Sequence, residues 1–449
     1  MEIKIHDWDD NETVNHNIIL IKGAIACKGQ TLNCEEGCKL LCRNDNAEGE
    51  WPVVHGSFKC LAKLKQGSNR IILEYKTARK QLDINLKYNE TKLCICPVYI
   101  VCKGHDGRFQ APPGCDNSIE NACKRIALGL NLVQCVFAEK LHEQGFGRKS
   151  FQLETDLYDG VPECHVFRSD LSVDDARKWD EQKLWEYFGR ELMCSELGDE
   201  HRKYLVFLSC TYWDGSSVSG DPALGGGGLA LLGSACLHTW PTDLANVVDC
   251  FTSKEKIGPS LLDNSCFRGT YGGCYSTSFG SVCHEIGHMF NLGHSPTGIM
   301  SRGFDHIGRV FTMSSNQHKN DEIALMPCLS VQLGPSTLVK SQTRSKKNQK
   351  EDDMTHLTKS CATLLAHHKW FNNDTDVELD MRFDSLRNVL TSENGLKVVQ
   401  LRASCGAVLK SWELGSKSPH KHLILPRTTS NTTSLVAMDA NGNILSLQI

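Results

Sequence analysis

A short window in the second half of the chain concentrates side chains that can bind a metal ion. Residues 284–300 read HEIGHMFNLGHSPTGIM, which contains three histidines, one glutamate and a closing methionine. His284 and His288 are four residues apart, so on a helix both imidazoles lie on one side, about 6 Å apart along the axis. Imidazole is a good zinc ligand, and a catalytic zinc has three protein ligands and one open position. The spacing therefore predicts that this pair supplies two ligands of one metal ion.

The third histidine can reach the same metal only if the helix ends before it. On a straight helix His294 would lie about 9 Å beyond His288. Asn291 and Gly293 occupy the interval, and these two residue types best tolerate a left-handed backbone. Pro296 then prevents the helix from resuming. We therefore expect the helix to end near Asn291 and the chain to fold back, which brings His294 to the metal.

Glu285 follows the first histidine and can reach water bound to the same metal ion. Zinc lowers the pKa of its bound water toward ~7 and polarises a carbonyl group. A carboxylate beside that water can take its proton and return it to a leaving amine. The predicted chemistry is hydrolysis by a metal-activated water, with one Zn²⁺ per chain and Glu285 as the general base.

The same window resembles the signature of the metzincin zinc metallopeptidases, H-E-x-x-H-x-x-G-x-x-H followed by a methionine turn. Here the pattern is HExxHxxNxxH, because Asn291 stands where the family has glycine. The resemblance implies that His284, His288 and His294 bind zinc and that Met300 forms an apolar floor beneath it. The alternative is a surface helix with unrelated histidines, which needs the third histidine and the methionine at these offsets by chance.

A second resemblance covers residues 95–370. The segment 95–154, which begins ICPVYIVCKGHDGRFQAPPG, and the segment GIMSRGFDHIGRVF at 298–311 are similar to a eukaryotic family described as zinc metallopeptidases. Fungal members of that family can carry a C-terminal jacalin-like lectin domain. This resemblance implies the same activity and raises the question of whether the C-terminal region here is a lectin.

Several elements must position such a site. Apolar residues recur at spacings of three or four over 117–144, which predicts a long backing helix. Asp116 or Asn117 can cap its start, and Gly145 can end it. The apolar runs at 94–103 and 204–213 predict buried strands.

A further strand and the zinc helix follow in the chain. Leu229, Ala230, Leu231 and Leu232 form a short apolar run after a glycine-rich stretch, and the zinc helix is expected over 276–291. The metzincin resemblance implies that the strand at 229–232 is a sheet edge, which would pair with an extended substrate by β-augmentation.

Two β-rich regions flank this core. We predict an N-terminal β-sandwich-like domain over 1–93, a metzincin-like zinc metallopeptidase domain over 94–370, and a C-terminal β-rich region over 371–449 that could be partly jacalin-like. The polar stretch at about 334–355 predicts a mobile surface loop. The expected fold class is α+β, in which a twisted sheet, a backing helix and a zinc helix lie between the two β-rich regions.

Composition narrows the class of protein. Of 449 residues, 40% are hydrophobic and 23% charged, and the net charge of -4 argues against nucleic-acid binding driven by bulk charge. No window approaches the roughly 18 apolar residues of a membrane span, and the first residues lack the apolar core of a signal peptide. We therefore expect a cytoplasmic protein whose 22 cysteines are mostly reduced. The basic run at 340–347 leaves nuclear entry open.

Two hypotheses from different classes compete. The favoured one is a zinc-dependent endopeptidase that acts on an extended peptide or protein. The other is a catalytically weak zinc-binding scaffold or a carbohydrate-recognition protein, which the β-rich ends suggest. Glu285 argues against a scaffold, because a scaffold needs no general base. The region 371–449 is short for a complete lectin prism, which argues against glycan binding.

Overall fold

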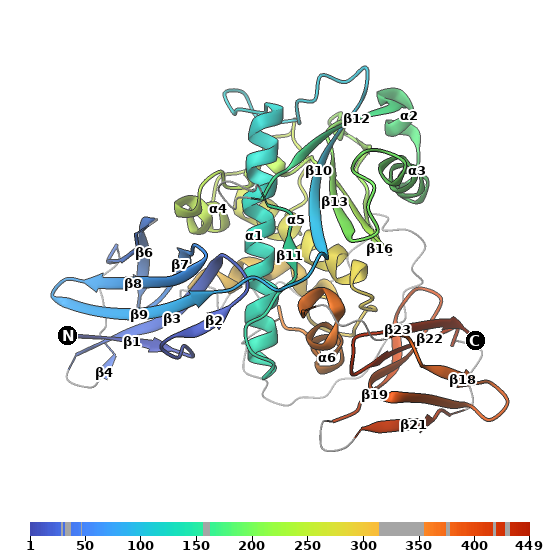
Figure 1. Cartoon of the computed structure of the whole chain (residues 1–449). Coiled ribbons are helices and arrows are strands. Elements are labelled where there is room, and N and C mark those ends of the chain that lie inside the picture. Colours follow the sequence, from blue (N-terminus) through green and yellow to red (C-terminus); the bar gives the residue numbers. More distant parts are fainter. Residues whose placement is uncertain are drawn as a thin grey trace.

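The fold is mixed α and β and contains several curled sheets. The computed structural model describes residues 1–27, 30–31, 37–45, 47–155, 162–313, 354–373, 378–415, 419–426 and 432–449. In Figure 1 the N-terminal strands lie on the left, helix α1 runs through the middle, and the C-terminal sheet lies at the lower right. Most of the predicted loop at 334–355, including the basic run, lies outside the described residues. Within the described residues, no helix is long and apolar enough to cross a membrane.

The N-terminal strands form one curled sheet in the order β1-β3-β7-β6-β5-β8-β9-β2, and β4 pairs with β3. Neighbouring strands are antiparallel except β2 and β9, which are parallel. The sheet encloses apolar side chains such as Leu20, Trp51 and Leu73. The strands are β1 (Glu2–His6), β2 (Glu12–Val14), β3 (Ile18–Cys27), β4 (Gln30–Thr31), β5 (Lys39–Arg43), β6 (Glu48–Val54), β7 (Ser57–Lys63), β8 (Gly67–Tyr75) and β9 (Ala78–Leu86).

The predicted long helix is confirmed as α1 (Ile119–Glu143). Its predicted N-terminal caps are wrong, because the side chain of Ser118 accepts the backbone N–H of Asn121. Asp116 accepts the N–H of Ser118 instead. At the other end Gly145 has a φ of +82°, the left-handed conformation expected of a residue that ends a helix.

A mostly parallel sheet lies between α1 and two shorter helices. Its order is β11-β10-β13-β17-β16, with β12 also paired to β10. Alternate residues of β10 face opposite cores: Ile95, Tyr99 and Val101 pack with α1, while Val98 and Ile100 pack with α3. The elements are β10 (Cys94–Lys103), β11 (Gln152–Leu153), β12 (His165–Ser172), α2 (Val173–Lys178), α3 (Glu181–Met193), β13 (Arg202–Leu208), β16 (Ala223–Gly226) and β17 (Leu229–Gly233).

The predicted position of the edge strand is wrong. Leu229, Ala230, Leu231 and Leu232 do form a strand, β17, but it is buried between β13 and β16. The reason is the glycine-rich run before it, where Gly227 has a φ of +52° and the chain reverses in a tight hairpin. Residues 223–226 therefore add an antiparallel strand outside β17, and β16 is the edge of the sheet.

The remaining central elements are short apart from α5, which packs against β16, β17, α4 and η3. A small hairpin of β14 and β15 precedes β16. The elements are β14 (Tyr212–Trp213), β15 (Val218–Ser219), η1 (Leu237–Thr239), η2 (Leu244–Asn246), α4 (Val247–Thr252), α5 (Tyr271–Met289), η3 (Arg302–Val310), α6 (Lys359–His367) and η5 (Lys369–Phe371).

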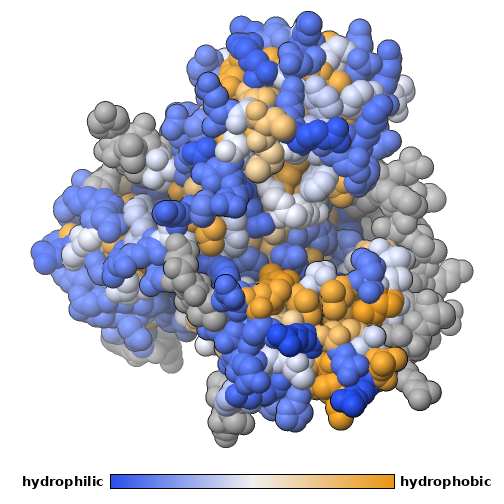
Figure 2. All heavy atoms as spheres, turned by 45° about the vertical axis from the view of Figure 1, so that its right-hand side comes forward, coloured by the Kyte–Doolittle hydropathy of each residue, from blue (hydrophilic) through white to orange (hydrophobic). Residues whose placement is uncertain are grey.

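The C-terminal sheet is built around the long strand β19, which pairs with β18, β20, β21 and β22. Most of its apolar side chains form a separate small core, but Val398 and Met438 belong to the main core. Leu386 and Ile424 are exposed, and Figure 2 shows an apolar area at the lower right, over this sheet. The strands are β18 (Arg382–Asp384), β19 (Val389–Arg402), β20 (Val408–Glu413), β21 (His420–Ile424), β22 (Ser434–Asp439) and β23 (Ile444–Gln448).

Candidate metal centre

Helix α5 carries the first two histidines and ends in a defined turn. The side chain of Thr270 accepts the N–H of Gly273 at its start. At its end Asn291 has a φ of +61°, and the N–H groups of Asn291 and Leu292 bond the carbonyls of His288 and Gly287. This pair of bonds is the Schellman arrangement that commonly ends a helix. The predicted chain reversal at Asn291 is therefore confirmed, although the helix begins earlier than residue 276.

Gly293, the other residue predicted for this turn, has a different role. It lies against the C-terminal sheet, where a Cβ would come within 2.8 Å of both Arg402 Nε and the carbonyl oxygen of Gly406. Glycine is therefore required here because the chain passes close to the C-terminal sheet, and not because the backbone is left-handed.

The three predicted histidines converge. The Nε2 atom of His288 lies 3.1 Å from Nε2 of His284 and 3.1 Å from Nε2 of His294. Ligands bound tetrahedrally at the usual zinc–nitrogen distance of about 2.0–2.1 Å are separated by about 3.3 Å. The three nitrogens are therefore spaced to hold a zinc ion.

Each of these imidazoles donates a hydrogen bond from its other ring nitrogen, Nδ1, to a backbone carbonyl. The Nδ1 atoms of His284, His288 and His294 lie 2.8, 2.9 and 3.0 Å from the carbonyl oxygens of Ile299, Leu292 and Cys405. A carbonyl can only accept a hydrogen bond, so the proton resides on Nδ1 and the lone pair on Nε2. The tautomer that binds metal through Nε2 is thus fixed at all three positions.

Burial keeps two of these histidines neutral. It lowers the pKa of His284 to about 3 and that of His288 to about 4, and the neighbouring imidazoles add to the effect. A neutral imidazole has the free lone pair that a metal ligand needs. At neutral pH both side chains are therefore ready to bind a cation.

Glu285 faces the edge of the parallel sheet. Its side chain is buried, and this burial raises the pKa of its carboxyl to about 8. A hydrogen bond from the backbone of Gly225 in β16 opposes that shift. A carboxyl with a pKa near neutrality suits a group that takes up and releases a proton.

Met300 lies directly against helix α5. It is buried, and a Cβ on Gly287 would come within 2.4 Å of its sulfur. The side chain thus packs on the α5 backbone next to His288, and the carbonyl of the preceding Ile299 holds His284. The sequence window therefore brings the methionine and all three histidines into one cluster.

The sequence did not point to the carbonyl partners or to Gly225. A backbone acceptor carries no side-chain signature, so neither Leu292 nor Cys405 could be recognised from residue types. A glycine-rich run before a strand indicates a tight turn, but it does not say which helix packs on it.

Another cluster contains potential ligands, but its charges are already paired. Cys96, Glu154 and His165 lie close together on β10, beside β11 and on β12. Glu154 pairs with Arg202, and its other oxygen lies 3.3 Å from His165 Nε2. The hydrogen bond from His165 is the main cause that holds the pKa of Glu154 at about 2. This cluster is explained as an ion-pair network that joins neighbouring strands.

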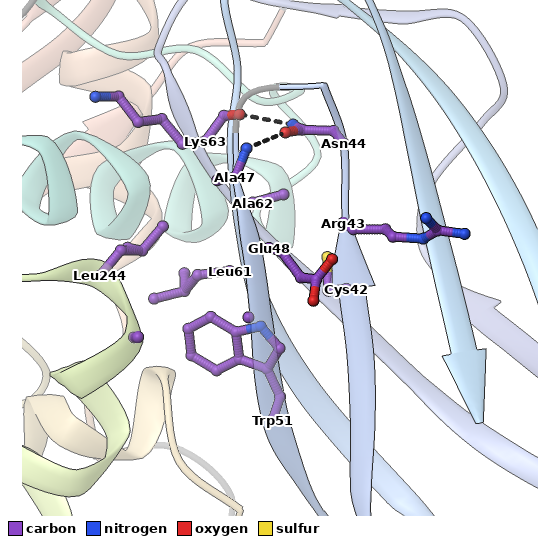
Figure 3. Close-up of a pocket in the computed structure, with 12 residues that line it drawn as sticks. Cys42, Arg43, Asn44, Ala47, Glu48, Trp51, Leu61, Ala62, Lys63 and Leu244 are labelled. Atoms are coloured by element: carbon purple, nitrogen blue, oxygen red, sulfur yellow. Dashed lines mark hydrogen bonds between the residues drawn. The ribbon is translucent and has the colours of Figure 1, made fainter. Parts of the chain in front are cut away.

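The pocket in Figure 3 lies elsewhere, between β5, β6 and β7 of the N-terminal sheet and Leu244 of η2. Its walls include the ring of Trp51. The side chain of Asn44 bonds the carbonyl of Lys63 and the N–H of Ala47, as the dashed lines show. The pocket shares no residue with the histidine cluster, and we assign it no chemistry.

The chain is similar to proteins described as peptidases. A family model with the description "Putative peptidase family" matches residues 2–373. "Putative zinc metalloproteinase C607.06c" of Schizosaccharomyces pombe is 26% identical over 334 residues, which is 69% of this chain and 54% of that protein. "Putative zinc metalloproteinase YIL108W" of Saccharomyces cerevisiae is 28% identical over 300 residues, which is 58% of this chain and 42% of that protein. The chain thus spans about half the length of these curated relatives.

Solved structures of OgpA from Akkermansia muciniphila also match. The wild type gives a TM-score of 0.45 at 15% identity and covers 82% of this chain and 94% of that chain. The catalytically inactive form in complex with an O-glycopeptide substrate gives a TM-score of 0.44 at 16% identity, with the same coverage.

Proposed function

The chain belongs to the family described as "Putative peptidase family", and from this membership we propose that it is a zinc-dependent endopeptidase. The observation that carries the proposal is the convergence of three Nε2 atoms, each on an imidazole whose Nδ1 is held by a backbone carbonyl. The names of the two yeast relatives agree with zinc as the metal. We propose one zinc ion per chain, bound by His284, His288 and His294.

The proposed roles divide among the residues of α5 and its surroundings. When bound, zinc would lower the pKa of water and polarise the scissile carbonyl. Glu285 would take a proton from the attacking water and deliver it to the leaving amine. Its burial beside β16 raises the pKa of the carboxyl to about 8. Met300 supports the histidines from beneath and does not bind the metal.

The metzincin-like arrangement is part of this proposal. The backing helix α1, the β16–β17 hairpin of the sheet and helix α5 follow one another in chain order, as in that group of peptidases. The edge strand for an extended substrate would be β16 and not β17, since β16 is last in the sheet order. Gly225 would then link substrate binding to the general base. Its strand would pair with the substrate, and its backbone bonds Glu285.

The test compares the wild type with Glu285→Ala. The variant should keep its zinc and its melting temperature but lose peptide hydrolysis by roughly 10²–10⁴-fold, because a positioned proton acceptor contributes about that much. Zinc content, melting temperature and cleavage of a broad peptide library measure the three quantities.

Two results would contradict the proposal. If Glu285→Ala cleaves as fast as the wild type, the activity belongs to another site. If the wild type holds stoichiometric zinc and cleaves no peptide, the zinc-binding scaffold becomes the better description. Carbohydrate recognition by residues 371–449 would then be examined with a glycan array, where no signal removes it.

A further inference from the structure

The third histidine is held by a part of the chain far from the metal-binding window. Its Nδ1 donates to the carbonyl of Cys405, 3.0 Å away and 111 residues later. Its backbone N–H donates to the carbonyl of Gly406 at 3.0 Å, and its carbonyl accepts the N–H of Val408 at 2.9 Å. These bonds make a parallel bridge between His294 and Ala407. The turn between β19 and β20 thus pairs with the metal-binding segment as a strand would.

The Nδ1 partners of the other two histidines do not belong to the C-terminal sheet. His288 uses the carbonyl of Leu292, four residues away, and His284 uses that of Ile299, fifteen residues away. Both acceptors lie inside the window that carries the ligands. His294 therefore differs from its partners, since its orientation depends on a different sheet.

Arg402, the last residue of β19, holds the turn that delivers this histidine. Its Nη2 donates to the carbonyl of Asn291 at 2.5 Å, and the side-chain oxygen of Gln400 accepts bonds of 2.6 and 3.0 Å from the guanidinium. The side chain is buried. A cation at the last carbonyls of a helix is favourable because of the helix dipole. Arg402 thus fixes the left-handed residue, and Cys405 and Gly406 fix the ligand that follows it.

We propose that residues 402–408 are the outer shell of the metal centre, where they position His294 as a ligand. This inference rests on the proposed function. The segment lies beyond residue 373, where the match to the family model ends. The C-terminal sheet is then a working part of the metal centre, in contrast to an attached module with a separate role. Loss of such an outer partner typically lowers metal affinity by about 10–100-fold.

Two variants perturb this segment without changing a ligand. Gly406 has a φ of +77°, and a Cβ there would lie 3.7 Å from His294 Nδ1, in ordinary contact. Gly406→Val strains the backbone, because a β-branched residue resists a positive φ, and this strain should move the carbonyls of Cys405 and Gly406. Arg402→Met removes the bond to Asn291 but keeps most of the buried volume.

Gly395→Val is the matched control. Gly395 is another left-handed glycine of the same sheet, with a φ of +86°, and a Cβ there would contact Pro419 and not the metal centre. This control carries a similar backbone strain in the same sheet, so it separates loss of stability from loss of metal.

Three quantities are measured on the full chain. They are the zinc affinity in competition with a chromophoric chelator, the visible spectrum of the cobalt-substituted protein, and the melting temperature of the metal-free protein. We expect Gly406→Val and Arg402→Met to bind zinc about 10–100-fold more weakly and to show altered cobalt bands. Gly395→Val should lose a similar amount of thermal stability and keep wild-type affinity and spectrum.

Each outcome gives a decision. Wild-type zinc affinity and cobalt spectrum in both test variants overturn the inference, and Arg402→Met alone decides if Gly406→Val does not fold. If the wild type binds zinc and hydrolyses peptides while both variants match it, only the inference about residues 402–408 fails. If the wild type binds no zinc, the proposed function fails and this inference fails with it.

Discussion

At the scale of single residues, Asn291 decides whether His294 can reach the other two histidines. It ends α5 with a φ of +61°, and its N–H and that of Leu292 bond back to the last turn of the helix. Glycine is the usual residue at this position of a Schellman turn, and asparagine is the next most tolerant. The asparagine that replaces the glycine of the metzincin pattern therefore keeps the same backbone conformation.

This gives a prediction about two substitutions. Asn291→Gly should keep zinc and activity, because glycine adopts the same left-handed conformation without strain. Asn291→Val should lose zinc binding or fail to fold, since a β-branched side chain is strongly disfavoured at positive φ. Zinc content and thermal unfolding of both purified variants provide the measurement. A Val variant with full zinc would show that His294 is not delivered by this turn.

The residue scale also shows what the sequence could and could not predict. The three histidines, Glu285 and Met300 stand in one window at spacings that helix geometry can interpret, and the structure brings the histidines together. The partner of His294 Nδ1 is a carbonyl 111 residues away. Any residue type has such a carbonyl, so only the folded chain identifies Cys405.

At the scale of elements, the sequence predicted the strands β10, β13 and β17 but not β11, β12 and β16, nor the order of the sheet. The apolar run over 94–103 corresponds to β10. The strand predicted over 204–213 is too long, because β13 ends at Leu208 and Tyr212–Trp213 form the separate strand β14. The short run at 229–232 is also a strand, but its apolar residues reflect burial between two neighbours. A sequence pattern reports that a strand is buried and does not report which strand lies outside it. The edge was therefore assigned to the wrong member of the β16–β17 hairpin.

Two adjacent glycines of β16 test how closely this edge packs on helix α5. A Cβ on Gly225 would meet the carbonyl oxygen of Glu285 at 2.2 Å, whereas a Cβ on Gly226 would meet nothing within 4 Å. Gly225→Ala should lower the free energy of unfolding by roughly 1–3 kcal/mol, as overpacking usually does. Gly226→Ala should change it by less than about 0.5 kcal/mol.

Urea unfolding and peptide cleavage of both variants check this prediction. Gly225→Ala should also lose hydrolysis, because it pushes the backbone of Glu285 away from β16. Equal stability of the two variants would mean that α5 and β16 are not in direct backbone contact.

At the scale of the whole molecule, the N-terminal sheet is joined to helix α1 by a buried ion cluster. Glu139 of α1 lies 2.9 Å from Lys22 of β3 and 2.6 Å from Arg148, which also reaches Glu12 of β2 at 3.1 Å. Apolar side chains of both parts form one continuous core. The division at residues 93 and 94 remains a prediction, but the N-terminal sheet is packed on α1 over a shared surface. Buried charges cannot be located from composition, because their partners lie far apart in the chain.

His16 makes this junction sensitive to pH. It follows β2, is 1% exposed, and has Glu139 and Arg148 as charged neighbours. Burial lowers its pKa from 6.5 to about 4, while Glu139 opposes and Arg148 adds to the shift. A folded-state pKa below the unfolded value means that the unfolded chain takes up the proton first. Above about pH 6.5 His16 therefore does not lower the free energy of unfolding. As the pH falls from 6.5 toward 4, His16 lowers the free energy of unfolding progressively.

The measurement compares the wild type with His16→Gln, which cannot titrate. Free energies of unfolding from urea titrations at pH 7.5 and pH 4.5 give the loss of stability for each protein. The wild type should lose about 2–3 kcal/mol more than the variant, since one unit of pKa shift corresponds to about 1.4 kcal/mol. The other titratable groups are common to both proteins, so their contributions cancel in the difference. Parallel losses would show that His16 is hydrated in the folded protein and that the N-terminal sheet does not pack on α1 as tightly as described.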